Sequence, residues 1–141
     1  MRILPALVIF AFCAFNSLPS FASEESPIVL GSFEIKSEGN SKTGKVTVSG
    51  ESDSVGVKYI SIAAFGKRIR LDKKDLEKLK EMHLNAVQLS YDGGHDSAEA
   101  GVLIIRLSTG YTVDTVDSRY IFVRGNGKAH VFDSLNDIGT R

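Results

Sequence analysis

The amino-acid sequence predicts an α+β fold that is predominantly antiparallel β, with about eight short hairpin-linked strands and one amphipathic helix at residues 72–83. Short segments of alternating apolar and polar residues, separated by glycine-containing turns, indicate the strands. Only one segment has helical periodicity. Strands and helices therefore do not alternate along the chain, which argues against a parallel doubly wound sheet. A β-sandwich with a helical insertion is the alternative.

Two segments show the strand pattern in its two forms. Residues 86–91 alternate, with Val87, Leu89 and Tyr91 on one side. Residues 101–107 instead contain a continuous apolar run, which is typical of a central strand covered on both faces.

A hairpin is predicted at Asn126-Gly127, because this dipeptide favours a two-residue type I′ turn. That turn places Val123 opposite His130. Gly66-Lys67 similarly predicts a type II′ turn, with glycine in the first central position.

A change in the strand pattern predicts a β-bulge in the strand that begins at Val57. The apolar residues change parity near Tyr59 and Ile60, and one extra residue in a strand has this effect.

The helix prediction for residues 72–83 rests on a cap and a stripe. Asp72 suits the N-cap, and an acidic residue at Asp75 complements the helix dipole. Leu76, Leu79 and either Met82 or His83 form a narrow apolar stripe, so the helix is expected to lie with one side against the rest of the fold.

Residues 1–22 resemble a cleavable signal peptide. Arg2 precedes an uncharged apolar run over residues 3–15, and Ser20-Phe21-Ala22 has small residues at the −3 and −1 positions of a cleavage site. The run is shorter than the ~20 residues that a membrane span needs. We therefore expect residues 23–141 to form a single exported globular domain with frayed termini and no stable membrane span.

The composition indicates the cellular compartment and excludes some classes of binding partner. The only cysteine is Cys13, so the processed chain has none. Small extracellular domains often rely on disulfides, which favours bacterial export to the periplasm or the medium. The whole chain has 17 basic and 17 acidic residues. This balance argues against a nucleic-acid or anionic-membrane binder.

One candidate binding site is a loop that combines glycines with ionisable side chains. Glycines allow a sharp turn and close approach to a ligand, although Asp and Gly also favour an ordinary solvated turn. The Asp and His side chains are also possible ligands for a divalent metal, but their spacing matches no metal motif. The loop residues are Tyr91, Asp92, Gly93, Gly94, His95 and Asp96.

The second candidate is a basic face, which could steer an acidic partner towards the protein. The alternative is that these residues simply keep a hairpin and a helix solvated. The residues are Lys67, Arg68, Arg70, Lys73, Lys74 and Lys78.

No recognisable catalytic motif, metal site or cofactor site is found in the sequence. We therefore expect a non-catalytic binding protein, similar to inhibitors or immunity proteins only in class, that acts on a protein partner in the cell envelope or outside the cell. A small-ligand or glycan binder is the alternative. A small hydrolase using His95 with Asp92 or Asp96 is the second alternative. A homodimer formed through an exposed sheet face is also compatible with the sequence.

Overall fold

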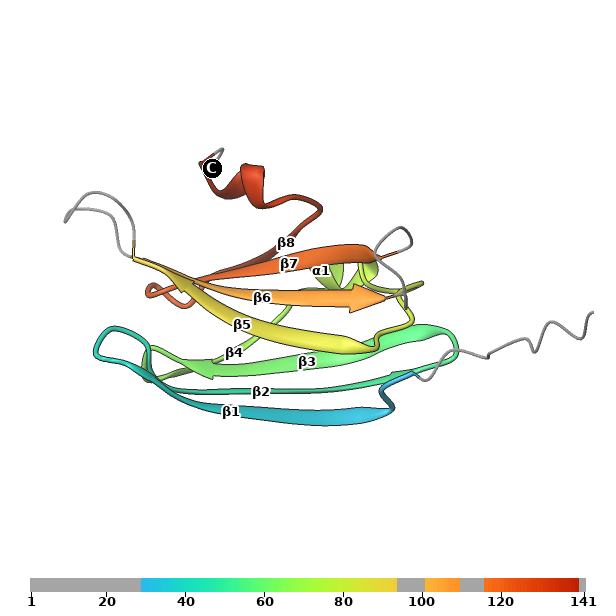
Figure 1. Ribbon diagram of the computed structural model, residues 1–141, viewed down its shortest axis with the longest axis horizontal. Helices are drawn as coiled ribbons and strands as arrows, with labels where there is room; N and C mark the ends of the chain where they lie inside the picture. Colours follow the sequence, from blue (N-terminus) through green and yellow to red (C-terminus); the bar gives the residue numbers. More distant parts are fainter. Residues whose placement is uncertain (1–28, 94–100, 110–115, 140–141) are drawn as a thin grey trace, which may run out of the picture.

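Two four-stranded antiparallel sheets, with strand orders β1-β2-β3-β4 and β5-β6-β7-β8, are stacked face to face (Figure 1). The computed structural model describes residues 29–93, 101–109 and 116–139. The first sheet consists of β1 (Ser32–Asn40), β2 (Gly44–Asp53), β3 (Gly56–Ala64) and β4 (Lys67–Arg70). The second consists of β5 (Ala86–Asp92), β6 (Val102–Thr109), β7 (Asp117–Arg124) and β8 (Ala129–Phe132).

The prediction of a predominantly antiparallel β fold is confirmed. Helical structure is much scarcer than predicted in the described residues, where it is limited to α1 (Lys73–Glu77) and the short 3₁₀ helix η2 (Leu135–Gly139). The two stacked sheets resemble the sandwich alternative more than an α+β fold.

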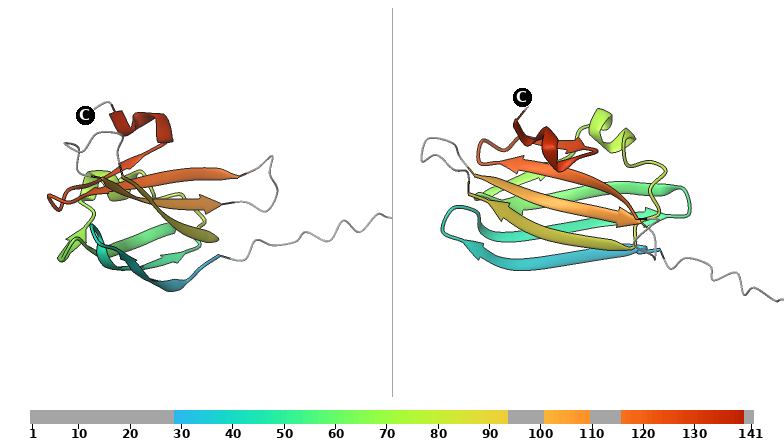
Figure 2. Two further views of the ribbon diagram at one scale, coloured as in Figure 1. Left: turned by 60° about the vertical axis from the view of Figure 1, so that its left-hand side comes forward. Right: turned by 45° about the horizontal axis from the view of Figure 1, so that its top comes forward.

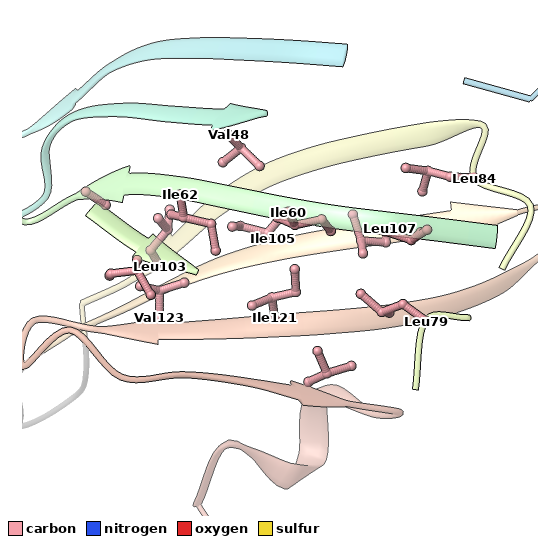
Figure 3. Packing of buried hydrophobic residues seen from close by; sticks show 14 of the residues in the cluster. Val48, Ile60, Ile62, Leu79, Leu84, Leu103, Ile105, Leu107, Ile121 and Val123 are labelled. Carbon is pink, nitrogen blue, oxygen red and sulfur yellow. The ribbon is translucent and has the colours of Figure 1, made fainter. Parts of the chain in front are cut away.

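The core lies between the sheets, and both contribute to it. The side chains of Ile60, Ile105 and Ile121 come from β3, β6 and β7 and meet in this layer (Figure 3). Leu79 and Leu84, from the connection between the sheets, extend the same cluster. Burying an aliphatic side chain of this size contributes about 1.5–3 kcal/mol, so this layer is the main source of stability.

β6 is the central strand predicted from its continuous apolar run. Ile105 is fully buried against the first sheet. Ile104 points to the opposite face, where it packs with Phe122 and Tyr120 in a second apolar cluster. Both faces of β6 are therefore covered, as the prediction required.

The predicted bulge is confirmed in β3. Glu51 of β2 faces Tyr59, whereas the next residue, Ser52, faces Val57. Lys58 is therefore the extra residue, and the two consecutive exposed positions Lys58 and Tyr59 produce the change of parity seen in the sequence.

The predicted Gly66-Lys67 turn is wrong by one residue. Ala64 pairs with Lys67, so Phe65 and Gly66 are the central residues, with φ values of 55° and 67°. Two positive φ angles define a type I′ turn. Phe65 is kept in this uncommon conformation by its packing against the core and by its N–H, which donates to Thr43 O at 2.6 Å.

The predicted register of the last hairpin is also wrong by one residue. Val123 faces Ala129 rather than His130. A type I′ turn needs positive φ at both central residues, but here Gly127 has a φ of 89° while Asn126 is not among the positive-φ residues. The hairpin instead has a three-residue loop with glycine in its last position, which shifts every pair.

The predicted helix at residues 72–83 is wrong in length. After Glu77 the hydrogen-bond pattern changes from α-helical to 3₁₀-like. The N–H groups of Leu79 and Met82 donate to carbonyls three residues earlier, at 3.0 and 3.1 Å. The stripe Leu76, Leu79, Met82 has a spacing of three residues. This spacing keeps a constant direction in a 3₁₀ arrangement but drifts around an α-helix.

The C-terminal segment, which the sequence suggested would be frayed, contains η2. It lies beside the second sheet on the side away from the first sheet (Figure 2). No helix among the described residues is both long and apolar enough to cross a membrane.

Candidate functional site

β4 presents two arginines to solvent. Arg68 and Arg70 are exposed and alternate with Ile69, whose side chain is buried in the core. Their partners across β3 are the small residues Ala63 and Ser61. Because these neighbours are short, the arginine side chains stand out from the outer face of the first sheet.

α1 adds two lysines immediately after β4. Asp72 is the N-cap, and its carboxylate accepts the N–H of Asp75 at 2.7 Å. The cap fixes where the helix starts, and Lys73 and Lys74 in its first turn are exposed.

The structure divides the predicted basic face into two groups. Lys67 Nζ donates to Gly125 O at 3.1 Å, and Lys78 Nζ donates to Val131 O at 2.6 Å. These two lysines therefore connect β4 and α1 to the hairpin of β7 and β8. The remaining residues form what we call the basic surface, namely Arg68, Arg70, Lys73 and Lys74.

Within the described part of the chain, no hydrogen bond or ion pair engages the side chains of the basic surface. Several other surface lysines are neutralised by nearby carboxylates. Lys58 lies 2.8 Å from Asp53, and its hydrogen bond is the main reason why the pKa of that carboxyl is lowered. The other such pairs are Lys36–Glu34, Lys45–Glu38 and Lys80–Glu77.

A cluster of ionisable groups that the sequence did not predict lies beside the basic surface. The Asp75 side chain is only 5% exposed. Its Oδ1 accepts the Val131 N–H at 3.1 Å and lies 3.2 Å from Lys78 Nζ, and its Oδ2 lies 3.0 Å from His130 Nδ1.

These contacts determine the charge state of Asp75. Burial raises the pKa of its carboxyl, but the hydrogen bonds from the Val131 N–H, His130 and Lys78 outweigh burial and hold the pKa below the ordinary aspartate value. Asp75 is therefore ionised at neutral pH.

The Asp75 cluster has a clear structural role. β8 is an edge strand. The N–H and C=O groups of Val131 point away from β7. On that outer side Asp75 accepts the N–H and Lys78 donates to the C=O. Side chains of α1 and of its C-cap residue Lys78 thus take the place of a further strand at this edge. No local spacing pattern predicts this contact, because Asp75 and Val131 are 56 residues apart in the sequence.

The predicted loop site is only partly described. Tyr91 and Asp92 end β5 and Gly93 follows, whereas Gly94, His95 and Asp96 lie outside the described residues. Tyr91 is half-buried, and it lines a hollow of about 200 Å³ between the sheets rather than standing free in solvent. Asp92 is exposed.

A groove of about 440 Å³ lies between the helical connection and the start of β7. Its lining includes Glu81 and His83 on one side, and Asp117 and Arg119 on the other. Arg119 also pairs with Asp133, with Nε 3.0 Å from Oδ1. The groove is therefore lined mainly by charged and polar groups.

Over residues 29–93, 101–109 and 116–139, no three His, Cys, Asp or Glu side chains lie close enough together to hold a metal ion.

These observations define a β-rich chain of two four-stranded sheets that carries an accessible basic surface. Comparison of the chain with protein-family models, with curated proteins and with solved structures found no match.

Proposed function

We propose that this chain is an exported, non-catalytic binding protein that acts on a protein partner in the bacterial cell envelope or outside the cell. Export is inferred from residues 1–22, which lie outside the described residues. The proposed contact site is the basic surface.

The observation that carries the proposal is the group of unpaired positive charges on β4 and α1. Four cationic side chains fall within seven residues, Arg68 to Lys74, and none is paired within the described part of the chain. Asp72 lies among them, but its carboxylate caps α1. The two other cations of the predicted face are used internally, which fixes the scaffold beneath the free ones.

An acidic protein surface is the partner that this arrangement fits best. Exposed charges of one sign attract a partner of opposite sign and raise its association rate, and salt weakens this effect. Arginine adds geometric selectivity, because its planar guanidinium can bind a carboxylate through two hydrogen bonds.

Capture experiments with matched charge variants test the proposal. The processed protein is used to capture partners from envelope and secreted fractions at low and moderate salt. We expect an acidic protein to be retained at low salt, to elute at moderate salt, and to be lost with the combined variant Arg68→Glu, Arg70→Glu, Lys73→Glu and Lys74→Glu.

The matched control is the combined variant Lys36→Glu, Lys42→Glu, Lys45→Glu and Lys128→Glu, which reverses four exposed lysines outside the basic surface. This control should retain the partner. If both variants captured it equally well, the basic surface would not be the binding site.

The groove beside α1 favours a small-ligand binder as a second candidate. Its volume of about 440 Å³ lies within the usual range for ligand pockets of about 300–1,000 Å³. Its charged lining suits a small polar ligand. A ligand that binds only the native state raises Tm, so a thermal-shift screen of sugars, peptidoglycan fragments and small dicarboxylates tests this candidate. Unchanged Tm values would count against it.

A further inference from the structure

We propose that β4 binds an extended acidic segment of the partner as a fifth strand of the first sheet. The inference deepens the proposed function and rests on it, because it assigns a binding mode and a ligand pattern to the basic surface. It concerns the main chain of β4 as well as its arginines.

The hairpin register shows which main-chain groups of β4 face outward. The pair that closes the two-residue turn is Ala64 and Lys67, and the closing pair of such a turn is hydrogen-bonded. Hydrogen-bonded and non-hydrogen-bonded pairs then alternate along an antiparallel ladder. Arg68 and Arg70 therefore occupy non-hydrogen-bonded positions, with their N–H and C=O groups directed away from β3.

β4 is an edge strand, and its outward groups are available. Among the described residues, none makes a main-chain hydrogen bond with Arg68 or Arg70 across this edge. The edge of the second sheet at β8 is treated differently, because Asp75 and Lys78 bind both main-chain groups of Val131. Side chains of α1 and its C-cap residue thus close the β8 edge, whereas the described residues leave the β4 edge without hydrogen-bond partners.

The charge at the open edge selects the occupant. Arg68 and Arg70 lie on the outer face of the sheet, so residues opposite them in an added strand would direct their side chains to the same face. Carboxylates at these two positions would meet the two unpaired guanidinium groups. At β1, the other edge of this sheet, Lys36 already pairs with Glu34 and offers no such excess charge.

The residue between the two carboxylates would point to the inner face, beside the buried Ile69. An apolar side chain would be favoured at that position because its neighbour Ile69 is apolar. The pattern expected in the partner is therefore acidic–apolar–acidic in an extended segment, which is strand addition with charge selection. Arginines can also serve only to keep an edge strand from pairing with another chain. Binding experiments with acidic peptides distinguish this protective role from recruitment of an acidic strand.

The probe is a blocked peptide of sequence Thr-Glu-Val-Glu-Thr. One matched version carries N-methyl groups on the two glutamates, which removes the donors that would face β4. A second carries an N-methyl group on the valine, whose N–H would point to solvent. All three peptides have the same charge, and the N-methylvaline peptide shows how N-methylation itself affects binding when no hydrogen bond to β4 is lost.

We expect the unmodified peptide and the N-methylvaline peptide to bind, and the N-methylglutamate peptide to bind at least tenfold more weakly. In the ¹⁵N-labelled processed protein, hydrogen exchange at the Arg68 and Arg70 amides should slow on peptide addition, while the amides of Glu34 and Lys36 in β1 should not change. Arg68→Glu with Arg70→Glu should abolish binding, and Lys42→Glu with Lys128→Glu should not.

Two results would overturn strand addition. Equal binding of all three peptides, without added protection at Arg68 and Arg70, would show a purely electrostatic contact and would leave the proposed function intact. Absence of binding by every peptide would reject both the pattern and the strand mode, while the capture experiment would still decide the proposed function independently.

Discussion

The carboxylate of Asp75 in α1 accepts the main-chain N–H of Val131 in β8 at 3.1 Å. A side chain from a helix of five residues therefore binds the main chain at the edge of the second sheet. Lys78 completes the arrangement by donating to Val131 O. The connection between the two sheets thus also protects an edge that could otherwise pair with another chain.

Asp75→Ala should destabilise the protein by about 2 kcal/mol, because the Val131 N–H would lose its partner in a buried setting. Urea unfolding of the processed protein measures the effect. Asp72→Ala is the matched control, since it removes only the N-cap and should cost about 1 kcal/mol. Equal losses for the two variants would mean that the contact with β8 adds nothing beyond the cap.

The Asp75 contribution should depend on pH. The folded-state pKa of its carboxyl is lowered, so the unfolded state binds more protons in acid. The contribution is then fully present above the unfolded pKa of about 4 and is lost as pH falls through the lower folded value. We expect the difference in unfolding free energy between the wild type and Asp75→Asn to be constant near neutral pH and to shrink in acid. A difference that stayed constant throughout would contradict the assignment.

Two glycines allow the docking of the helical connection to be tested. Gly56 has a φ of 137°, and a Cβ there would lie 1.8 Å from Lys80 O. Gly66 has a φ of 67°, but a Cβ there would meet no atom within 4 Å. Gly66→Ala should therefore cost only the left-handed backbone penalty of about 1–2 kcal/mol.

Gly56→Ala should cost at least about 1–3 kcal/mol more than Gly66→Ala, because the main chain at Lys80 must move. Thermal or urea unfolding of both variants gives the comparison. Similar stabilities would show that the connection after α1 is not held tightly against β3.

The sequence predicts the strands well because burial imposes a period of two on them. The bulge at Lys58 was also predictable, since two consecutive exposed residues leave a visible change of parity. The turns were displaced by one residue because packing decides which residue takes positive φ. At Phe65 the core and the Thr43 carbonyl outweigh the preference for glycine.

The residues of the basic face could be predicted from the sequence. Which of them bind main-chain carbonyls and which stay unpaired could not be predicted. Nothing in the local sequence distinguishes Lys67 and Lys78 from Lys73 and Lys74. Their difference arises only when Gly125 and Val131, more than fifty residues away, are brought next to two of the four lysines. Long-range pairing of this kind leaves no periodic signal in a single sequence.

This division of the basic residues predicts opposite effects on stability and on binding. Lys78→Met should destabilise the protein by about 1 kcal/mol or more, because its side chain donates to a main-chain carbonyl at a sheet edge and lies beside buried Asp75. Lys73→Met and Lys74→Met should each change stability by less than about 0.5 kcal/mol, because neither lysine has a partner in the described part of the chain.

Binding to an acidic partner should show the reverse order, with the larger loss for Lys73 and Lys74. Urea unfolding and titration of the captured partner give the two measurements. If Lys73→Met destabilised the fold as much as Lys78→Met, the separation of scaffold lysines from contact lysines would be wrong.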